Sequence, residues 1–320
     1  MRKELFLLFF IVIFISSYKT NQSVSKPEDA LSVIPETISE AMNYLTSDDL
    51  KGRSTTTEGI DKAASFIENV LSKANVKPYF ETYRDSFIVN QKYGYNVVGF
   101  LEGQDEELKN EYIVIGAHYD HIGFGKKVDN DSIANGANDN ASGTSVVLAL
   151  SSYLAIKKNN KRSVIFVLFS GEEMGLLGSK HLGDRLKSEN LNLYTMINFE
   201  MLGVPLNGRD YEVFLTGYEI SNMANVMNTY ANSNFVGFSE ISKQYNLFMR
   251  SDNFPFYQQF RVPSHTISSC DLSNFDYYHH VDDELDKIDL NFMSDVTIKM
   301  APVMEAICNS TSQEIKLNEE

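Results

Sequence analysis

The feature that most constrains the fold is an alternation of strand-like and helix-like apolar runs that begins at residue 112. Residues 112–117 and 163–169 are short apolar runs rich in β-branched side chains, which is typical of strands buried on both faces of a sheet. Residues 144–156, between them, form a longer run of helical length. Strands that alternate with helices form parallel βαβ units. We therefore predict an α/β fold with three layers, α/β/α, around a mixed, largely parallel central sheet.

The rest of the chain supplies further elements on both sides of this unit. Two β-like runs, 79–89 and 95–101, precede it and are expected to pair antiparallel. By apolar periodicity, helices are predicted at 35–45, 60–74, 175–186, 220–230 and 289–308, and strands at 196–201, 212–216 and 262–268. Residues 232–250 are expected to form a loop or a short lid. Pro302 is expected to kink or interrupt the last helix.

The N-terminus has the pattern of a secretory signal peptide. Arg2 and Lys3 precede an apolar run at 5–15, and the small residues Ser16 and Ser17 follow it. The apolar run is short for a bilayer span, so an uncleaved anchor is the weaker alternative, and no stable membrane insertion is expected after cleavage. We predict a signal peptide at 1–17, a flexible lead-in at 18–34 and a single domain at 35–320, in a protein that is secreted or periplasmic.

Composition narrows the class of protein further. A chain of 320 residues with 43% hydrophobic residues can bury a full α/β core, and neither a repeat nor a break in composition divides it. The formal net charge of -15 argues against a nucleic-acid partner, which would require a basic surface. In an exported protein, Cys270 and Cys308 either form one disulfide bridge or remain two buried thiols.

Polar residues with ligand chemistry follow the predicted buried strands. Three potential ligands, His118, Asp120 and His121, come directly after 112–117. Glu172 and Glu173 follow 163–169, and Glu200 lies in 196–201. Ligands of open α/β sheets bind outside the carboxyl ends of the strands. We therefore expect these side chains to converge.

The residue types fit a metal site that activates water. Such a site needs imidazole and carboxylate ligands, an open coordination position and a base that is not itself a ligand. His118 is a nitrogen ligand whose other ring N–H Asp120 could accept, and Asp139, in GANDNASG, could bridge two ions. Adjacent glutamates cannot easily face one atom, so one of Glu172 and Glu173 is expected to bind metal and the other to act as base. The second imidazole is His279 or His280.

Each residue has an ordinary structural explanation when it is taken alone. A lone histidine after a strand is more often a hydrogen-bonded core or loop residue, and Glu172 and Glu173 could simply favour the start of the next helix. GANDNASG is also composed of ordinary turn residues. Glu200 is harder to explain away, because a buried carboxylate needs a cation or a hydrogen-bond network. The occurrence of all these segments in one chain favours the metal site.

Five segments, read in order, resemble a known family: GAHYDH, GANDNASG, FSGEEMGLLGS, MINFEMLG and YYHHVDDELDKID. They are similar to the co-catalytic zinc exopeptidases of clan MH, specifically the secreted bacterial aminopeptidase-like family, with a phosphorylase/hydrolase-like fold. The resemblance implies two Zn²⁺ ions, one held by His118, Asp139 and Glu200 and the other by Asp139, Glu173 and His279. It also implies Glu172 as general base, Tyr278 as the phenol that stabilises the oxyanion, and a cis peptide bond from Asp139 to Asn140.

Two positions depart from the family pattern. Glu200 stands where the family commonly has Asp, and Asn253 replaces a His in the SDNFPF segment, which puts a role in the site at that position in doubt. The function expected from the resemblance is a secreted aminopeptidase that cleaves peptide substrates, with Glu172 moving the proton. A glutaminyl cyclase-like acyltransferase with one zinc ion is the first alternative. A carboxypeptidase or dipeptidase of the same fold and a non-catalytic binding module are the others.

Overall fold

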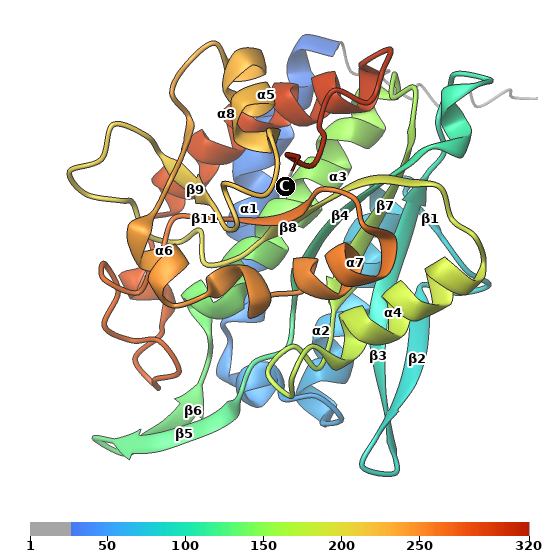
Figure 1. Ribbon diagram of the computed structural model, residues 1–320. Helices are drawn as coiled ribbons and strands as arrows, with labels where there is room; N and C mark the ends of the chain where they lie inside the picture. Colours follow the sequence, from blue (N-terminus) through green and yellow to red (C-terminus); the bar gives the residue numbers. More distant parts are fainter. Residues whose placement is uncertain (1–26, 320) are drawn as a thin grey trace, which may run out of the picture.

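A computed structural model describes residues 27–319, which form a central sheet with helices on both faces (Figure 1). The helices are α1 (Val33–Leu45), α2 (Glu58–Lys73), α3 (Gly143–Lys157), α4 (Leu177–Ser188), α5 (Met223–Ala231), α6 (Glu240–Gln244), α7 (Asn253–Phe260) and α8 (Leu290–Asn309). The sheet contains β1 (Lys77–Pro78), β2 (Arg84–Val89), β3 (Lys92–Leu101), β4 (Tyr112–His118), β7 (Ser163–Phe169), β8 (Leu193–Phe199), β9 (Val213–Leu215), β10 (Val236–Gly237) and β11 (Ser264–Ser268). A separate hairpin pairs β5 (Gly123–Val128) with β6 (Asp131–Ala134).

The strand order explains how one edge of the sheet gathers residues that are far apart in sequence. The order is β1-β3-β7-β4-β8-β11-β9-β10, and β2 pairs with β3. Strands β7, β4, β8 and β11 are parallel neighbours. On either side of this group, β3 pairs antiparallel with β7 and β9 pairs antiparallel with β11. The predicted mixed sheet is confirmed, with a parallel centre and antiparallel pairings on either side of it. Because β4 lies between β7 and β8, the carboxyl ends of these three strands meet.

Successive side chains of the central strands point to opposite faces of the sheet and pack in two separate apolar layers. Ile113 and Ile115 of β4 pack with α1, α2, α3 and α8 on one face, and Val114 packs with α4 and α7 on the other. Helix α3 is buried at every position from Gly143 to Leu154, which explains why its sequence is apolar all round. The three-layer α/β/α prediction is confirmed.

The predicted flexible lead-in is wrong over the part that the structure describes. Residues Pro27–Ser32 form a 3₁₀ turn that leads directly into α1, and both Ala30 and Ile34 are fully buried in the core. Their burial against the core holds this segment in place. The predicted signal peptide and residues 18–26 lie outside the described residues. Within 27–319, no helix combines the length and the apolar character needed to cross a membrane.

Three other segments differ from the prediction. Helix α8 is not interrupted at Pro302, whose side chain faces solvent and whose missing N–H removes only one hydrogen bond. The β5–β6 hairpin lies where no strand is predicted, because half of the residues of β5 are exposed and the sequence lacks apolar alternation. Residues 232–250, predicted as loop or lid, contain β10, α6 and a 3₁₀ turn (Leu247–Met249). Cys270 and Cys308 are two buried free thiols.

Candidate metal centre

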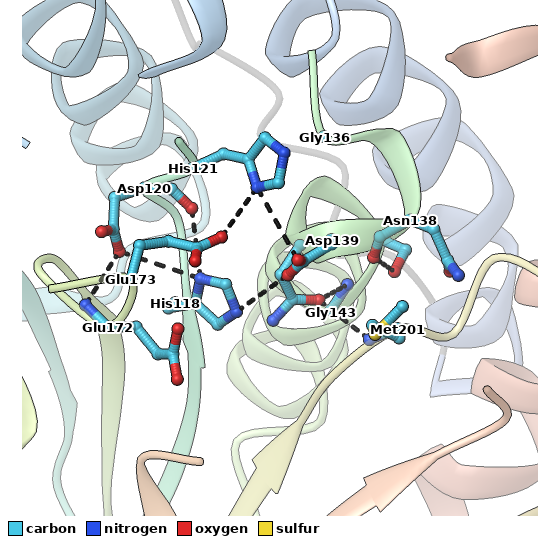
Figure 2. Close-up of polar contacts among 12 residues, drawn as sticks. His118, Asp120, His121, Gly136, Asn138, Asp139, Gly143, Glu172, Glu173 and Met201 are labelled. Atoms are coloured by element: carbon cyan, nitrogen blue, oxygen red, sulfur yellow. Dashed lines mark hydrogen bonds and ion pairs between the residues drawn. The ribbon is translucent and has the colours of Figure 1, made fainter. Parts of the chain in front are cut away.

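The predicted site residues come together at the carboxyl ends of the three central strands. Figure 2 shows five of them, His118, Asp120, Asp139, Glu172 and Glu173. His118 is the last residue of β4, Glu172 and Glu173 follow β7, and Glu200 follows β8. Asp139 enters from the π-helical turn Ala137–Ser142 that precedes α3. The bond between Asp139 and Asn140 is cis. Topology therefore places side chains from four separate loops around one point.

Asp139 lies between two imidazoles. Its Oδ1 atom is 3.3 Å from Nε2 of His118, and its Oδ2 atom is 3.3 Å from Nε2 of His279. The Nε2 atom of His279 is also 3.0 Å from Oε2 of Glu173. A carboxylate whose two oxygens face two different nitrogen ligands has the arrangement of a bridging group.

Several polar atoms of this centre are buried without a hydrogen bond. Within the described residues they include Nε2 of His118, Nε2 of His121, Oδ2 of Asp139 and Oε2 of Glu200. Buried polar groups are normally paired, and imidazole nitrogens and carboxylate oxygens are the ligands that zinc takes in proteins. The donor set therefore fits a divalent cation.

The electrostatics of the centre favour positive charge. Burial disfavours the imidazolium form of His279, but hydrogen bonds with Asp139 and Glu173 outweigh this effect and raise its pKa to about 10. Burial raises the pKa of Glu200 to about 7. Without a metal, protons on these groups compensate the negative charge of the carboxylates. A metal cation would do so more effectively, and its binding should release the protons.

The adjacent carboxylates Glu172 and Glu173 differ in surroundings. Figure 2 shows Glu173 pointing toward His121 while Glu172 turns to a different side. Burial and the Asp139 carboxylate favour a protonated Glu173, but hydrogen bonds from His121 and His279 outweigh them and lower its pKa. Burial raises the pKa of Glu172 well above the ordinary range. Glu173 therefore has the properties of an ionised ligand, and Glu172 those of a group that takes up a proton readily.

The role expected of the Asp120 carboxylate must be corrected. The Nδ1 atom of His118 lies 3.1 Å from the backbone carbonyl of Asp120 and 3.8 Å from its carboxylate. The carbonyl therefore fixes the imidazole tautomer. The carboxylate instead accepts hydrogen bonds from the Thr55 hydroxyl at 3.0 Å and from the backbone N–H of Glu172 at 3.3 Å. Asp120 thus positions the loop that carries the two glutamates.

Tyr278 and His279 lie together beside a cavity. Their rings stack with centroids 3.9 Å apart, and Tyr278 lines the cavity together with Glu172 and Glu200. Burial raises the pKa of the Tyr278 phenol far above its ordinary value, so that it remains a hydrogen-bond donor. His280 instead accepts a hydrogen bond from the backbone N–H of Asp282.

The cavity is lined by both acidic and apolar side chains. Asp139, Glu172 and Glu200 line it next to the metal centre. Met201, Leu247 and Leu272 also line it, and Arg250 contributes one cationic side chain. A small molecule with an amino group and an apolar side chain would find complementary groups here.

Sequence reasoning missed Arg53, which ties the loops of the site together. The side chain is fully buried, and burial lowers its pKa to about 10. Its guanidinium donates to the backbone carbonyls of four residues on three segments: Leu45, Tyr119, Asn135 and Gly136. Only backbone atoms accept these bonds, so no pattern of side-chain types reveals them.

The GANDNASG segment has a second task that the sequence did not reveal. Asn140 accepts hydrogen bonds from the backbone N–H groups of Gly143 and Met201, and it donates to the carbonyl of Phe199. The Asp283 carboxylate accepts from the backbone N–H groups of Asn138 and Asp139 at 2.7 and 3.0 Å. These bonds set the position of Asp139 relative to Glu200.

Asn253, which replaces the histidine of the family pattern, has a structural role. Its amide donates to the carbonyls of Phe248 and Ser264 and accepts from the Thr266 hydroxyl. These bonds satisfy the polar groups of a fully buried side chain. Asn253 therefore holds α7 against β11.

Comparison with known proteins gives three findings on family and fold. The family model described as Peptidase family M28 matches residues 96–304. A probable zinc metalloprotease of Pyrenophora teres f. teres is 38% identical over 107 residues, 33% of this chain and 22% of that protein. Aminopeptidase YwaD of Bacillus subtilis is 36% identical over 110 residues, 34% of this chain and 22% of that protein. The chain spans 22% to 36% of the length of such relatives.

Solved structures share the fold at low sequence identity. The LapA aminopeptidase of Legionella pneumophila superposes with a TM-score of 0.69 at 19% identity, over 97% of this chain and 81% of that one. A glutaminyl cyclase of Porphyromonas gingivalis superposes with a TM-score of 0.65 at 14% identity, over 88% of this chain and 98% of that one. At these identities the likeness shows the architecture alone.

Proposed function

Because the chain belongs to peptidase family M28, we propose that it is a zinc-dependent aminopeptidase that removes residues from the N-terminus of peptides. The observation that carries this proposal is the placement of Asp139 between His118 and His279, with one oxygen facing each ring. That placement supports two ions bridged by one carboxylate. Names of relatives that include zinc metalloprotease and aminopeptidase agree with it.

Two ions would divide the ligands between them. His118 and Glu200 would hold one ion, Glu173 and His279 the other, and Asp139 both. When bound, the zinc ions would supply Lewis acidity for activating water and polarising a carbonyl. Glu200, in place of the usual Asp, lies one residue beyond β8, where its backbone N–H donates to the carbonyl of Ile267.

The remaining residues would handle protons and charge. Glu172 would accept a proton from water and return it to the leaving amine, since burial raises its proton affinity. Tyr278 would donate a hydrogen bond to the developing oxyanion. The acidic side chains of the cavity would hold the substrate's free α-ammonium group, which an aminopeptidase requires.

A substrate pair tests the proposal directly. We expect hydrolysis of leucine p-nitroanilide but not of its N-acetyl derivative, because the acetyl group removes the ammonium charge. Chelator should abolish the activity and added zinc should restore it. Equal hydrolysis of the blocked substrate, or activity that resists a chelator able to strip the protein, would contradict the proposal.

The glutaminyl cyclase alternative predicts a different product. A peptide with N-terminal glutamine would lose ammonia and form a cyclic N-terminus, whereas an aminopeptidase would release free glutamine. Mass spectrometry separates the two products. The bridging position of Asp139 favours the aminopeptidase, because the cyclase alternative uses one ion.

We also propose that the protein is exported, on the strength of the N-terminal pattern of Arg2, Lys3 and the apolar run at 5–15. Cell fractionation followed by N-terminal sequencing tests this. A mature chain that still begins at Met1 and stays inside the cell would contradict it.

A further inference from the structure

A third imidazole, His121, lies at the metal centre and belongs to neither ligand set. Its ring is buried, and its Nδ1 atom is 2.9 Å from Oε1 of Glu173 and 3.8 Å from Oδ2 of Asp139. The other oxygen of Glu173, Oε2, is 3.0 Å from Nε2 of His279. The Glu173 carboxylate is therefore held between two imidazoles, one on each oxygen.

Distance alone does not separate hydrogen bonding from metal ligation here, because ligand atoms of His121, Asp139 and Glu173 also lie within 4.8 Å of one another, close enough to hold an ion. The distinction rests on which carboxylate oxygens each imidazole approaches. Ligands of a tetrahedral zinc ion with bonds near 2 Å lie about 3.3 Å apart. His279 Nε2 is 3.3 Å from Asp139 Oδ2 and 3.0 Å from Glu173 Oε2, so these atoms can share one ion. His121 faces the opposite oxygen of Glu173 at an ordinary hydrogen-bond distance.

We propose that His121 is a positioning residue that donates its Nδ1–H to Oε1 of Glu173 and so turns Oε2 toward the ion shared with Asp139 and His279. An ionised carboxylate only accepts, so Nδ1 carries the hydrogen in this pair. The fixed carboxylate then loses less conformational freedom when the ion binds. Partners of this kind typically change metal affinity by about tenfold to a hundredfold.

The surroundings of His121 fix the ring in this orientation. Its backbone N–H donates to the carbonyl of Arg53 at 3.3 Å. Gly136, with φ of 58°, leaves the space that the ring occupies, since a Cβ atom there would lie 2.5 Å from Cγ of His121. Within the described residues, Nε2 of His121 is buried and makes no hydrogen bond. The polar contacts of the side chain are therefore made by Nδ1, and the shorter of them, at 2.9 Å, is with Glu173.

Two substitutions separate the hydrogen bond from the imidazole itself. His121→Asn keeps an N–H donor near the position of Nδ1, whereas His121→Leu removes the donor at similar volume. His280→Asn is the matched control, because His280 is adjacent to His279 but bonds to Asp282 instead. Circular dichroism checks that each variant folds, and His121→Ala replaces the leucine variant if that one does not.

The measurement is metal affinity, made by titrating zinc into the metal-free protein against a chromophoric chelator, with the visible spectrum of the cobalt form as a second readout. The inference rests on the two-ion centre proposed above. We expect two ions in the wild type and unchanged affinity for the first ion in every variant. We expect the second ion to bind tenfold to a hundredfold more weakly in His121→Leu and within a few-fold of wild type in His121→Asn and His280→Asn.

The contrary outcomes are distinguishable. Two ions in the wild type with an unaltered second affinity in His121→Leu would overturn the role of His121 and leave the aminopeptidase proposal intact. Equal weakening in His121→Asn and His121→Leu, with a shifted cobalt spectrum, would show that the imidazole is itself a ligand. A wild type that binds a single ion would refute the two-ion centre and this role with it.

Discussion

At the scale of single residues, the neighbouring glutamates Glu172 and Glu173 should respond differently to the same substitution. Glu172→Gln should retain both metals and lose turnover by about a hundredfold to ten-thousandfold, because an amide cannot accept the proton. Glu173→Gln should weaken metal binding, since a charged ligand becomes neutral. Zinc content measured beside kcat for both variants checks this.

The reverse pattern would assign the two roles the other way. If Glu172→Gln lost zinc while Glu173→Gln kept it and merely slowed, Glu172 would be the ligand. Hydrolysis at wild-type rates in both variants would place the active site elsewhere. Glu189→Gln, on the surface at the end of α4, is a suitable control.

A second prediction at this scale concerns His265 and pH. The side chain is fully buried, with Nδ1 on the carbonyl of Thr216 and Nε2 on the Ser221 hydroxyl, and burial lowers its pKa to about 4 from 6.5. The unfolded chain binds this proton more readily than the folded chain, so folding stability should fall as pH drops from 6.5 to 4. The full loss is about 3 kcal/mol.

Urea unfolding at pH 7 and at pH 5 measures that contribution. His265→Gln does not titrate, so its stability should depend less steeply on pH over this window than that of the wild type. The site's carboxylates titrate in both proteins, and the comparison cancels them. Identical slopes would show that His265 is not responsible.

Sequence reasoning found the residues whose chemistry is visible in their own side chains. His118, Glu173 and Glu200 are ligand types placed after apolar strands, so position and type pointed to them together. The structural roles of Arg53 and Asp283 were missed because they bind backbone carbonyls and N–H groups, which nearly every residue carries. His121 lay in view beside Asp120, but nothing in the spacing showed that its ring would face Glu173.

At the scale of elements, the start of α3 is unusually intolerant of a side chain. A Cβ atom on Gly143 would lie 2.3 Å from the carbonyl oxygen of Phe199 and 2.5 Å from Oδ1 of Asn140. Alanine is ordinarily preferred to glycine in a helix by about 1 kcal/mol. Here Gly143→Ala should instead destabilise the protein by about 2 kcal/mol or more, because backbone must shift.

Gly183 in α4 provides the matched control. Its nearest neighbour to a new Cβ would be Cγ of Gln259, at an ordinary 3.7 Å. Gly183→Ala should therefore stabilise the protein by roughly 0.5 to 1 kcal/mol. Chemical denaturation of both variants gives the comparison, and equal effects of the same sign would contradict the close approach of α3 to the β8 loop.

The elements whose bounds were predicted well from the sequence are those that are buried along almost their whole length. Strand β7 has the predicted bounds, and α3 differs by one residue at each end, because both are buried and uniformly apolar. Helix α7 was missed because its eight residues include Pro255 and two glutamines, with only three buried positions. Tertiary contacts with α4 and β11 decide its structure.

At the scale of the whole molecule, Arg53 joins the N-terminal region to the site. Arg53→Met would keep the length of the side chain but leave buried carbonyls on three segments without a donor. Each unpaired buried group costs about 1 to 3 kcal/mol, so we expect a loss of about 3 kcal/mol or more in the free energy of unfolding.

Arg84→Met is the control for the loss of a charge. Arg84 is partly exposed and pairs with Glu68, an interaction worth less than about 1 kcal/mol. Urea denaturation of both variants tests the difference. A loss from Arg53→Met no larger than that from Arg84→Met would show that the three segments hold together without this guanidinium.

The overall architecture was predictable because alternating buried strands and helices leave few alternatives. The order of strands was not, since β9 and β11 differ little in sequence character from their neighbours. The segment before residue 35 was misjudged for a related reason. Its buried apolar residues, Ala30 and Ile34, are too few to form a recognisable pattern, and their burial depends on a core built from distant parts of the chain.

The β5–β6 hairpin projects from the body of the molecule between His118 and Asp139 (Figure 1). The base of the hairpin packs on Gly52. Arg53 donates hydrogen bonds to the carbonyl of Tyr119 before the hairpin and to the carbonyls of Asn135 and Gly136 after it. The two ends of the hairpin are therefore fixed by contacts that do not involve its exposed tip at residues 129–130. A peptide inserted at that tip is expected to leave His118 and Asp139 in place.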